Sequence, residues 1–432
     1  MLIFWLVVLL FQNGKAIDHQ LKRHLESRGL PSTSRYITSE TFIQNVDHFS
    51  DTDNRTWKQH FLSNLYNDKG YGINFLRIGG ESALLETELL DDGFQMMVWA
   101  KHFGAAAYAL EHRFYGQSHP FKDLSQPNLH YLNIGQALAD IAFFIEHINE
   151  KRKLADSKWV IFGGSYSGNL AAWFRQEYPD LVVGAVASSA PVQATLDFPG
   201  YLEVVERAFE KSCTETLTDK DAQHFSHSVL GSVVMSVQRD TPSHSRLKSG
   251  CLEIKKRLKE IKKQSQQQWE NIPNYCSGYN DYVKQHTNIS HSRHRAWQWQ
   301  LCTEFGFCQT TSQVKKDSIF NNISLPLSYY TDFCVDVFGK NISESSMSSS
   351  IQKTNQLYGG AKNFNVCHVY KRPNRQVKSL FIEGTSHCAD TLWDTDDDPD
   401  VLKSARRKIK KEISKWINWK KLTENETNNI II

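Results

Sequence analysis

A serine that follows a glycine pair stands between two apolar stretches, in a pattern that can carry nucleophilic chemistry. The segment Val160–Ala172 reads VIFGGSYSGNLAA. The residues before Ser165 are typical of a strand and those after it of a helix, so the serine would lie on a tight strand-to-helix turn. There the dipole of the helix favours the oxyanion that forms during attack. We therefore predict Ser165 as the nucleophile and the N–H of Tyr166 as an oxyanion donor.

The residues around this serine are small, as a turn with closely approaching backbones requires. Gly163 stands two positions before Ser165, and Ser167 stands two positions after it, where glycine is the usual residue. A second glycine pair, Gly79 and Gly80, ends an earlier apolar run and predicts a loop whose Gly80 supplies the other oxyanion N–H. In both places, a glycine-rich turn without a chemical role is the alternative.

A serine hydroxyl is a poor nucleophile until a base takes its proton. His387 is the candidate base, because Ser379–Ile382 is a strand-like run and Glu383–Ser386 a loop that would present the histidine. A histidine with a structural role is the alternative. A zinc site is not predicted, since the cysteines lack the paired C-x-x-C spacing of such sites. No other metal and no cofactor are predicted.

The segments around these residues alternate between strands and helices. Strands are predicted at 74–78, 105–110, 159–162, 181–188 and 377–383, and helices at 136–148 and 401–419. This alternation predicts an α/β fold whose parallel sheet is covered by helices on both faces. Residues 196–345 lack strand alternation and predict a helical insertion, which leaves a core of residues 36–195 and 346–432. The serine-rich stretch 343–350 predicts an exposed loop.

The first residues predict export from the cytoplasm. Leu2–Phe11 is an apolar run of signal-peptide length, which places a signal peptide at residues 1–16. All eight cysteines lie from Cys213 onward, and an even set suggests disulfides without fixing their pairing. Sequons that could accept glycans stand at Asn54, Asn288, Asn322, Asn341 and Asn425. A net charge of +3 does not indicate nucleic acid as a partner, and no other stretch approaches a membrane span.

Further motifs occur in a fixed order from about residue 40 to 420: Ile78–Glu81, Glu111–Ser118, Tyr131–Leu132, Gln136–Asp140, Gly163–Tyr166, Trp297–Gly306 and Gly384–Ala389. Together they resemble the serine peptidase family of lysosomal Pro-X carboxypeptidase, dipeptidyl-peptidase II and thymus-specific serine protease, and most of all the last branch. The resemblance implies an α/β-hydrolase sheet with a helical cap domain inserted between nucleophile and histidine. It also implies a secreted or lysosomal exopeptidase acting on peptides, often after proline, with Ser165 as nucleophile and His387 as base.

One family motif is missing. The family carries its triad acid in an Asn-Gly-x-x-Asp-Pro-Trp segment, whereas this chain continues from Tyr358–Val366 directly into Cys367–Pro373. No Asp or Glu occurs between Glu344 and Glu383, so no triad acid is identified. The acid orients the histidine, and its loss costs a serine protease on the order of 10⁴-fold in kcat. An impaired enzyme is therefore expected, unless Asp390 or Asp336 substitutes.

Two other functions stay open beside an impaired exopeptidase. The missing acid favours a catalytically silent relative that binds peptides or proteins, and the fold alone would also allow an esterase or lipase. Glu81 and Glu304 are charged residues within the family-like motifs, and each could face the free terminus of a peptide. A structural carboxylate is the alternative for both. The direction of cleavage and the formation of a homodimer are left open.

Overall fold

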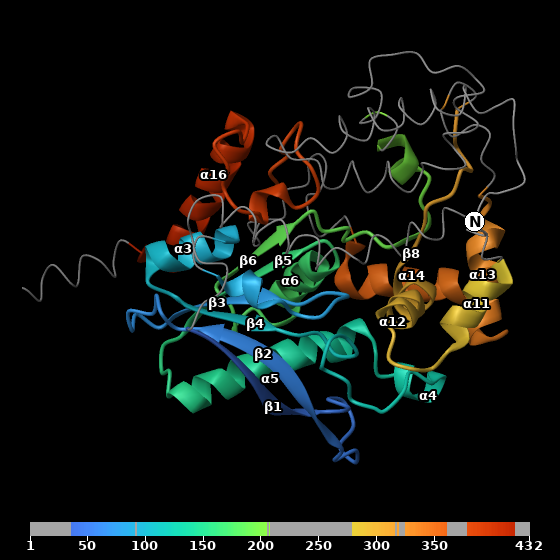
Figure 1. Cartoon of the computed structure of the whole chain (residues 1–432), viewed down its shortest axis with the longest axis horizontal. Coiled ribbons are helices and arrows are strands. Elements are labelled where there is room, and N and C mark those ends of the chain that lie inside the picture. The colour runs from blue at the N-terminus through green and yellow to red at the C-terminus, as the bar shows by residue number, and fades with distance from the viewer. Residues whose placement is uncertain are drawn as a thin grey trace, which may run out of the picture.

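The computed structural model describes residues 36–90, 93–204, 207, 279–315, 318, 325–360 and 378–419. Its central element is a six-stranded sheet with the strand order β1-β2-β4-β3-β5-β6 (Figure 1). The strands are β1 Ile37–Asn45, β2 Thr56–Asn64, β3 Ile73–Ile78, β4 Ala106–Leu110, β5 Lys158–Gly164 and β6 Gly184–Ser188. The pairs β1–β2 and β2–β4 are antiparallel, and the remaining pairs are parallel. The predicted parallel-type α/β sheet is thereby confirmed.

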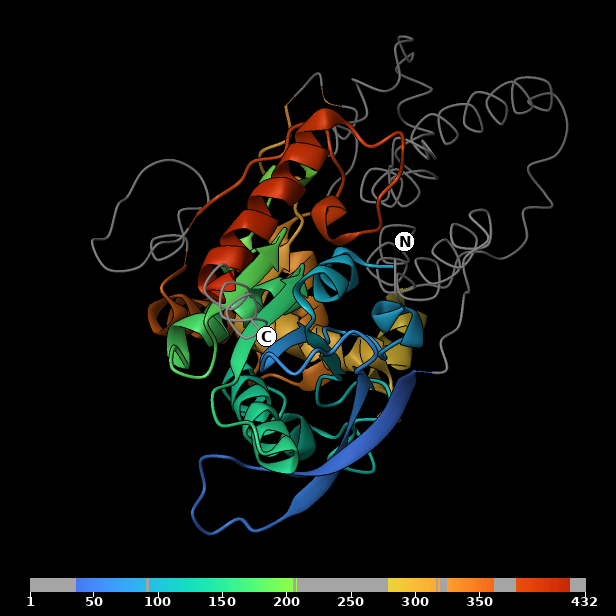
Figure 2. The same cartoon turned by 90° about the vertical axis from the view of Figure 1, so that its left-hand side faces the viewer.

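Helices cover both faces of the sheet (Figure 2). Helices α5 Ile134–Arg152 and α6 Tyr166–Glu177 pack on the face that carries Leu76 and Ile161. Helices α3 Gln95–Phe103 and α16 Asp400–Trp416 pack on the opposite face, which carries Phe75 and Val160. Successive side chains of a strand point to opposite faces, so β3 and β5 are covered from both sides, and β5 contains the continuous apolar run 159–162.

The remaining elements are short helices and a second, small sheet. They are η1 Glu86–Leu89, α4 Gln126–Leu129, β7 Thr195–Asp197, α11 Tyr279–Thr287, α12 Arg293–Gln300, η2 Leu301–Phe305, β8 Gly306–Cys308, α13 Leu327–Phe338, α14 Glu344–Tyr358 and η3 Ala389–Thr391. Helices α11 to α13 gather at one end of the molecule, on the right of Figure 1. A disulfide joins Cys302 to Cys334 and so ties η2 to α13.

Three local predictions are wrong. Residues 378–382 of the predicted strand 377–383 pair with no strand, and Phe381 is 89% exposed, because they do not reach the sheet edge at β6. The predicted loop 343–350 is the first half of α14, since Ser343 accepts the N–H of Ser346 and begins the helix. The predicted insertion without strands contains β8, which pairs with β7 in parallel.

Some predictions concern residues outside the described part of the chain. These are the signal peptide at 1–16, the sequons at Asn322 and Asn425, and the four cysteines Cys213, Cys251, Cys276 and Cys367. Within the described residues, no helix has the length and apolar character that crossing a membrane requires.

Candidate active site

Ser165 lies on a sharp turn between β5 and α6. Its backbone angles are φ 59° and ψ −128°, a conformation that costs a non-glycine residue about 1–3 kcal/mol. The N–H of Ser165 donates to the carbonyl of Ser188 on β6 at 2.9 Å, and the N–H of Gly168 donates to the carbonyl of Ser165 at 2.9 Å. This strained turn places Ser165 where β5 ends and α6 begins, which is the geometry of a nucleophile elbow.

The neighbours of Ser165 are as small as the turn demands. A Cβ atom on Gly163 would lie 2.0 Å from the carbonyl oxygen of Ser167, so no larger residue fits there. Ser167 stands where glycine is usual, and it is buried. Its hydroxyl donates to the carbonyl of Gly164 at 2.9 Å and accepts the N–H of Gly164 at 3.0 Å. The serine therefore adds hydrogen bonds across the turn without crowding it.

The loop after β3 brings the second predicted oxyanion residue to the same place. A Cβ atom on Gly80 would lie 3.6 Å from the Cβ of Ser167, at the start of α6. Gly79 is packed more tightly, since a Cβ there would lie 2.7 Å from the carbonyl oxygen of Leu110. Tyr166 and Gly80, the two predicted donors, thus both lie at this end of α6, as a two-donor oxyanion hole requires.

A buried carboxylate holds this loop in place. Glu111 follows β4 and is 1% exposed. One of its oxygens accepts the N–H of Leu84 at 3.1 Å, and the other accepts the hydroxyl of Ser118 at 2.7 Å and the N–H of Gln117 at 2.8 Å. Glu111 therefore connects the Gly79–Gly80 loop to its own loop, residues 111–118.

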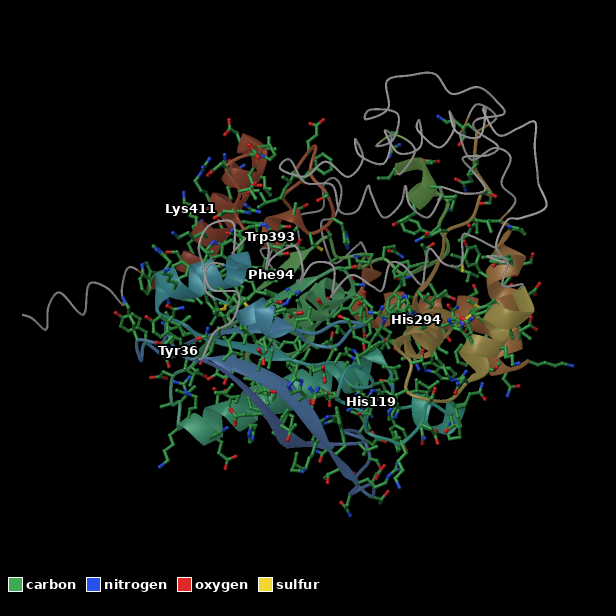
Figure 3. The ribbon with its side chains drawn as sticks, viewed as in Figure 1. Tyr36, Phe94, His119, His294, Trp393 and Lys411 are labelled. Carbon is green, nitrogen blue, oxygen red and sulfur yellow. A yellow bond between two sulfur atoms is a disulfide. The ribbon has the colours of Figure 1, made fainter. Side chains whose placement is uncertain are left out.

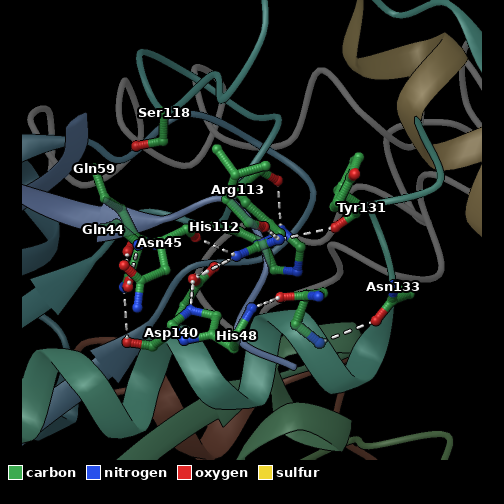
Figure 4. Close-up of polar contacts among 12 residues, drawn as sticks. Gln44, Asn45, His48, Gln59, His112, Arg113, Ser118, Tyr131, Asn133 and Asp140 are labelled. Carbon is green, nitrogen blue, oxygen red and sulfur yellow. Dashed lines mark hydrogen bonds and ion pairs between the residues drawn. The ribbon is translucent and has the colours of Figure 1, made fainter. Parts of the chain in front are cut away.

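An ion pair with no solvent contact fixes loop 111–118 to helix α5 (Figure 4). Nε and Nη2 of Arg113 donate to the two oxygens of Asp140 at 2.6 Å each, and the two side chains are 0% and 1% exposed. Nη1 of Arg113 donates to the carbonyl of Tyr131 at 2.9 Å, and Nε2 of His48 lies 2.8 Å from Asp140. Removing one partner of such a pair costs about 3–5 kcal/mol, so the loop is held rigidly.

The segment that carries His387 lies against the elbow. The N–H of Cys388 donates to the hydroxyl of Ser189 at 2.9 Å, and a Cβ atom on Gly164 would lie 3.0 Å from the Sγ of Cys388. His387 is exposed. Among the hydrogen bonds of the described residues, none joins His387 to the hydroxyl of Ser165. Catalytic hydrogen bonds often tighten only when substrate binds, so the lack of this bond does not remove His387 as the candidate base.

Helix α16 anchors the residues that follow His387. Nη2 of Arg406 donates to the carbonyl of Ala389 at 2.7 Å, and Nη1 lies 2.5 Å from a carboxylate oxygen of Asp398. The ring of Trp393 packs edge-on against Phe94, with centroids 6.3 Å apart (Figure 3). The position of the candidate base therefore depends on a well-held loop, although the strand predicted before it is absent from the sheet.

A neighbouring thiol controls the charge of the candidate base. The negative charge of Cys388 raises the pKa of His387 to about 9. Burial alone would raise the pKa of Cys388, but the charge of His387 and a hydrogen bond from it outweigh burial and lower that pKa. With a pKa near 9, His387 is mostly protonated at neutral pH, and in that form it cannot accept a proton.

Asp390 is better placed than Asp336 to substitute for the missing acid. The carboxylate of Asp390 accepts the hydroxyl of Ser188, and its charge contributes to the raised pKa of His387. Burial raises the pKa of Asp390 itself. Asp336 lies on the exposed side of α13, in the predicted insertion. The segment that would carry the family's acid falls near residues 361–377, outside the described part of the chain.

The two glutamates predicted to face a substrate terminus occupy different environments. Burial raises the pKa of Glu81, and the charges of His387 and of Arg293 on α12 oppose that rise. Glu81 is thus within electrostatic reach of the candidate base. Glu304 accepts the N–H of Ile134, the first residue of α5, at 2.9 Å, and burial raises its pKa to about 8. Its other oxygen is buried without a hydrogen bond in the described structure. Glu304 therefore has a structural use, as a cap of α5.

The described residues contain no group of three histidine, cysteine, aspartate or glutamate side chains that could hold a metal ion. Two contributors to the site were not singled out in the sequence: Cys388, which lies in the motif Gly384–Ala389, and Arg406, which lies in the predicted helix 401–419.

Comparison with known proteins places this site in a family. The family model described as serine carboxypeptidase S28 matches residues 44–288 and 245–409. The chain belongs to this family of serine peptidases. The Caenorhabditis elegans protein K12H4.7 is 31% identical over 452 residues, which cover 88% of each chain. The thymus-specific serine protease of Mus musculus is 28% identical over 87% of this chain and 86% of its own length.

A third S28 relative matches over a shorter stretch. The lysosomal Pro-X carboxypeptidase of Mus musculus is 36% identical over 197 residues, which cover 43% of this chain and 40% of that protein. Membership of the S28 family confirms the resemblance identified in the motifs, and the chain is a serine peptidase by descent with an α/β-hydrolase fold.

Proposed function

We propose that this S28 protein is a serine exopeptidase of the secretory pathway or lysosome, with low activity because it lacks the family's triad acid. The observation that carries the proposal is the strained turn at Ser165, against which the segment bearing His387 packs. The missing Asp-Pro-Trp segment supports the reduced activity. The predicted signal peptide supports the location, as do the sequon residues Asn54, Asn288 and Asn341, which are all exposed.

The proposed reaction divides peptide hydrolysis into two steps. His387 takes the proton of the Ser165 hydroxyl while its oxygen attacks the peptide carbonyl, and the N–H groups of Tyr166 and Gly80 stabilise the oxyanion. His387 then gives the proton to the leaving amine, and an acyl-enzyme remains. Water, deprotonated by the same histidine, releases the acid and restores Ser165. The carboxylates of Glu81 and Asp390 both stabilise the imidazolium, since the charge of each raises the pKa of His387.

Peptides with a free terminus are the proposed substrates, and both the dipeptidyl-peptidase and the Pro-X carboxypeptidase type fit the family. We assign Glu81 the role of pairing with the α-amino group of the substrate, because its charge interacts with that of His387, and this role favours the dipeptidyl-peptidase type. Glu304 is less suited to this role, because it caps α5 and one of its oxygens is buried.

Replacing Glu81 with glutamine should raise KM about tenfold for peptides with a free amino terminus, because a charge-assisted hydrogen bond is worth about 1.5–3 kcal/mol. The same peptides with an acetylated terminus serve as the control, and their KM should stay within twofold. Steady-state kinetics on both sets decides the point. An equal rise for free and acetylated peptides would show that Glu81 does not read the terminus.

The proposal is tested with purified protein and proline-containing peptides whose products are identified by mass spectrometry. Release of a terminal residue or dipeptide is expected from the wild-type protein and not from Ser165→Ala. Cleavage that persists in the variant would show that another protein or another residue does the chemistry.

A catalytically silent peptide-binding relative is the second candidate. The missing acid favours it. Peptide binding that survives Ser165→Ala, with turnover by neither form, would establish this function. The esterase or lipase alternative has no such support, and a preference for long acyl chains over peptides would be needed to revive it.

A further inference from the structure

The phenol of Tyr166 belongs to a closed ring of buried polar groups. Its oxygen lies 2.9 Å from Nε2 of His112 and accepts Nε2 of Gln300 at 2.8 Å. The amide oxygen of Gln300 accepts the hydroxyl of Tyr115 at 2.6 Å. The backbone N–H of Tyr115 donates to the carbonyl of His112 at 3.1 Å and closes the ring. None of the four side chains is more than 5% exposed.

The direction of each hydrogen bond in this ring is determined. Burial lowers the pKa of His112 to about 4, so its imidazole is neutral and carries one proton. Nδ1 lies 2.7 Å from the carbonyl of Arg113, which can only accept, so the proton is on Nδ1 and Nε2 is an acceptor. The hydroxyl of Tyr166 must therefore donate to His112. Its lone pairs remain free for Gln300, and Gln300 in turn accepts from Tyr115.

The ring joins three segments that lie far apart in the sequence. His112 and Tyr115 belong to the loop that the ion pair of Arg113 holds rigidly, Tyr166 begins the helix after the elbow, and Gln300 ends α12. Tyr166 is also the residue whose backbone N–H is the predicted oxyanion donor. A displacement of its side chain would displace that N–H, because both belong to the first turn of α6.

Resting on the proposed function, we propose that the phenol of Tyr166 is a positioning group, through which His112 and Gln300 hold the oxyanion N–H in place. The packing of α12 against the core then affects the reactivity of Ser165. The aromatic side chain of Tyr166 also packs against those of Trp297 and Phe305, with ring centroids 5.3 Å apart in each case. Loss of the hydroxyl therefore leaves the side chain packed while its polar anchors are lost.

Tyr166→Phe tests the hydroxyl directly. The rate constant for acylation of Ser165 by a fluorophosphonate should fall about 10- to 100-fold, since small displacements in an active site and weakened oxyanion donors cost this much. KM for peptides should stay within twofold, because Tyr166 is buried and its phenol is not accessible to a peptide. A rate within twofold of the wild-type value, in a variant that unfolds at the wild-type temperature, would overturn the proposal.

Two glutamines on α12 provide a matched pair. Gln300→Met removes the contacts to Tyr166 and Tyr115. Gln298→Met, on the same helix, removes contacts to the sulfurs of Cys302 on η2 and Cys334 on α13. Gln300→Met should slow acylation as Tyr166→Phe does, and Gln298→Met should not. Equal effects of the two substitutions would mean that α12 matters only for stability and would overturn the proposal.

Amide hydrogen exchange separates this inference from the proposed function. Peptides covering residues 163–170 should exchange at least tenfold faster in Gln300→Met than in Gln298→Met, whether or not Ser165 reacts. If the wild-type protein is not acylated but the two variants differ in exchange, the proposed function fails and the positioning role of Tyr166 is supported. If the wild-type protein is acylated and the difference is absent, the ring is overturned and the proposed function stands.

Discussion

Replacing Cys388 with alanine should increase the rate at which Ser165 is acylated at pH 6.5, on the order of 100-fold. The charge of Cys388 raises the pKa of His387 to about 9, so below that pH most of the protein carries an imidazolium that cannot act as a base. Without the thiol, the pKa of His387 should return toward its ordinary value of 6.5. The neutral fraction at mildly acidic pH then rises, and the acid limb of the rate profile moves to lower pH.

The other free cysteine of the described residues is a matched control. Cys308 is 4% exposed, and burial raises its pKa to about 12, so it stays a neutral thiol and should not influence His387. The pH profile of Cys308→Ala should therefore match that of the wild-type protein, whereas that of Cys388→Ala should be displaced. Superimposable profiles for all three proteins would show that Cys388 does not set the charge of the base.

Replacing His387 with alanine should slow acylation of Ser165 about 100-fold at pH 9, where the wild-type base is half neutral. In a complete triad, loss of the serine or the histidine costs about 10⁶-fold, and loss of the acid alone about 10⁴-fold. The three residues act as a unit. In a site that already lacks its acid, removal of the histidine should therefore cost only the remaining factor, about 100-fold. The measurement is the second-order rate constant for a fluorophosphonate.

The size of this loss also reports on Asp390. If Asp390 orients His387 as the missing acid would, His387→Ala should cost 10⁴-fold or more, and Asp390→Asn should cost most of the same factor. If Asp390 has no such role, Asp390→Asn should leave the rate within a fewfold. A His387→Ala protein that reacts as fast as the wild type would remove His387 from the mechanism.

Local pattern was sufficient to predict the part of the fold that carries Ser165. The apolar runs that became β3, β4 and β5 are buried on both faces, and a strand, a glycine pair and a helix former follow one another at 160–172. Gly163 shows why this motif can be recognised in a sequence. Only glycine fits at that position, because a Cβ atom there would clash with the carbonyl oxygen of Ser167. The parallel sheet and the elbow therefore followed from short segments of sequence.

The errors arose where a segment depends on distant partners. Residues 378–382 are apolar enough for a strand, but a strand exists only when another strand accepts its hydrogen bonds, and Leu380 and Phe381 are exposed instead. The serines at 343–350 suggested a loop, whereas Met347, Ile351, Thr354 and Tyr358 form the buried stripe of a helix. That stripe was the available signal, and the serines obscured it.

The hydrogen-bond ring and the thiol of Cys388 could not be read from the sequence for the same reason. His112 and Gln300 are nearly 190 positions apart (112 and 300), and only the packing of α12 on the core joins both to Tyr166. Cys388 stands next to His387 in the sequence, but its effect on the base depends on its burial against Gly164. The motifs identified residues of the candidate site, whereas tertiary contacts determine their charges and the directions of their hydrogen bonds.

Fluorophosphonate labelling of the purified protein, with Ser165→Ala as the control, tests the central claim most directly. The claim is that Ser165 is an activated nucleophile despite the missing acid. We expect covalent labelling of the wild-type protein that is slow, increases from pH 6 to pH 9, and is absent from Ser165→Ala, with the modified peptide containing residue 165. Absence of labelling at any pH, or equal labelling of the variant, would contradict the claim.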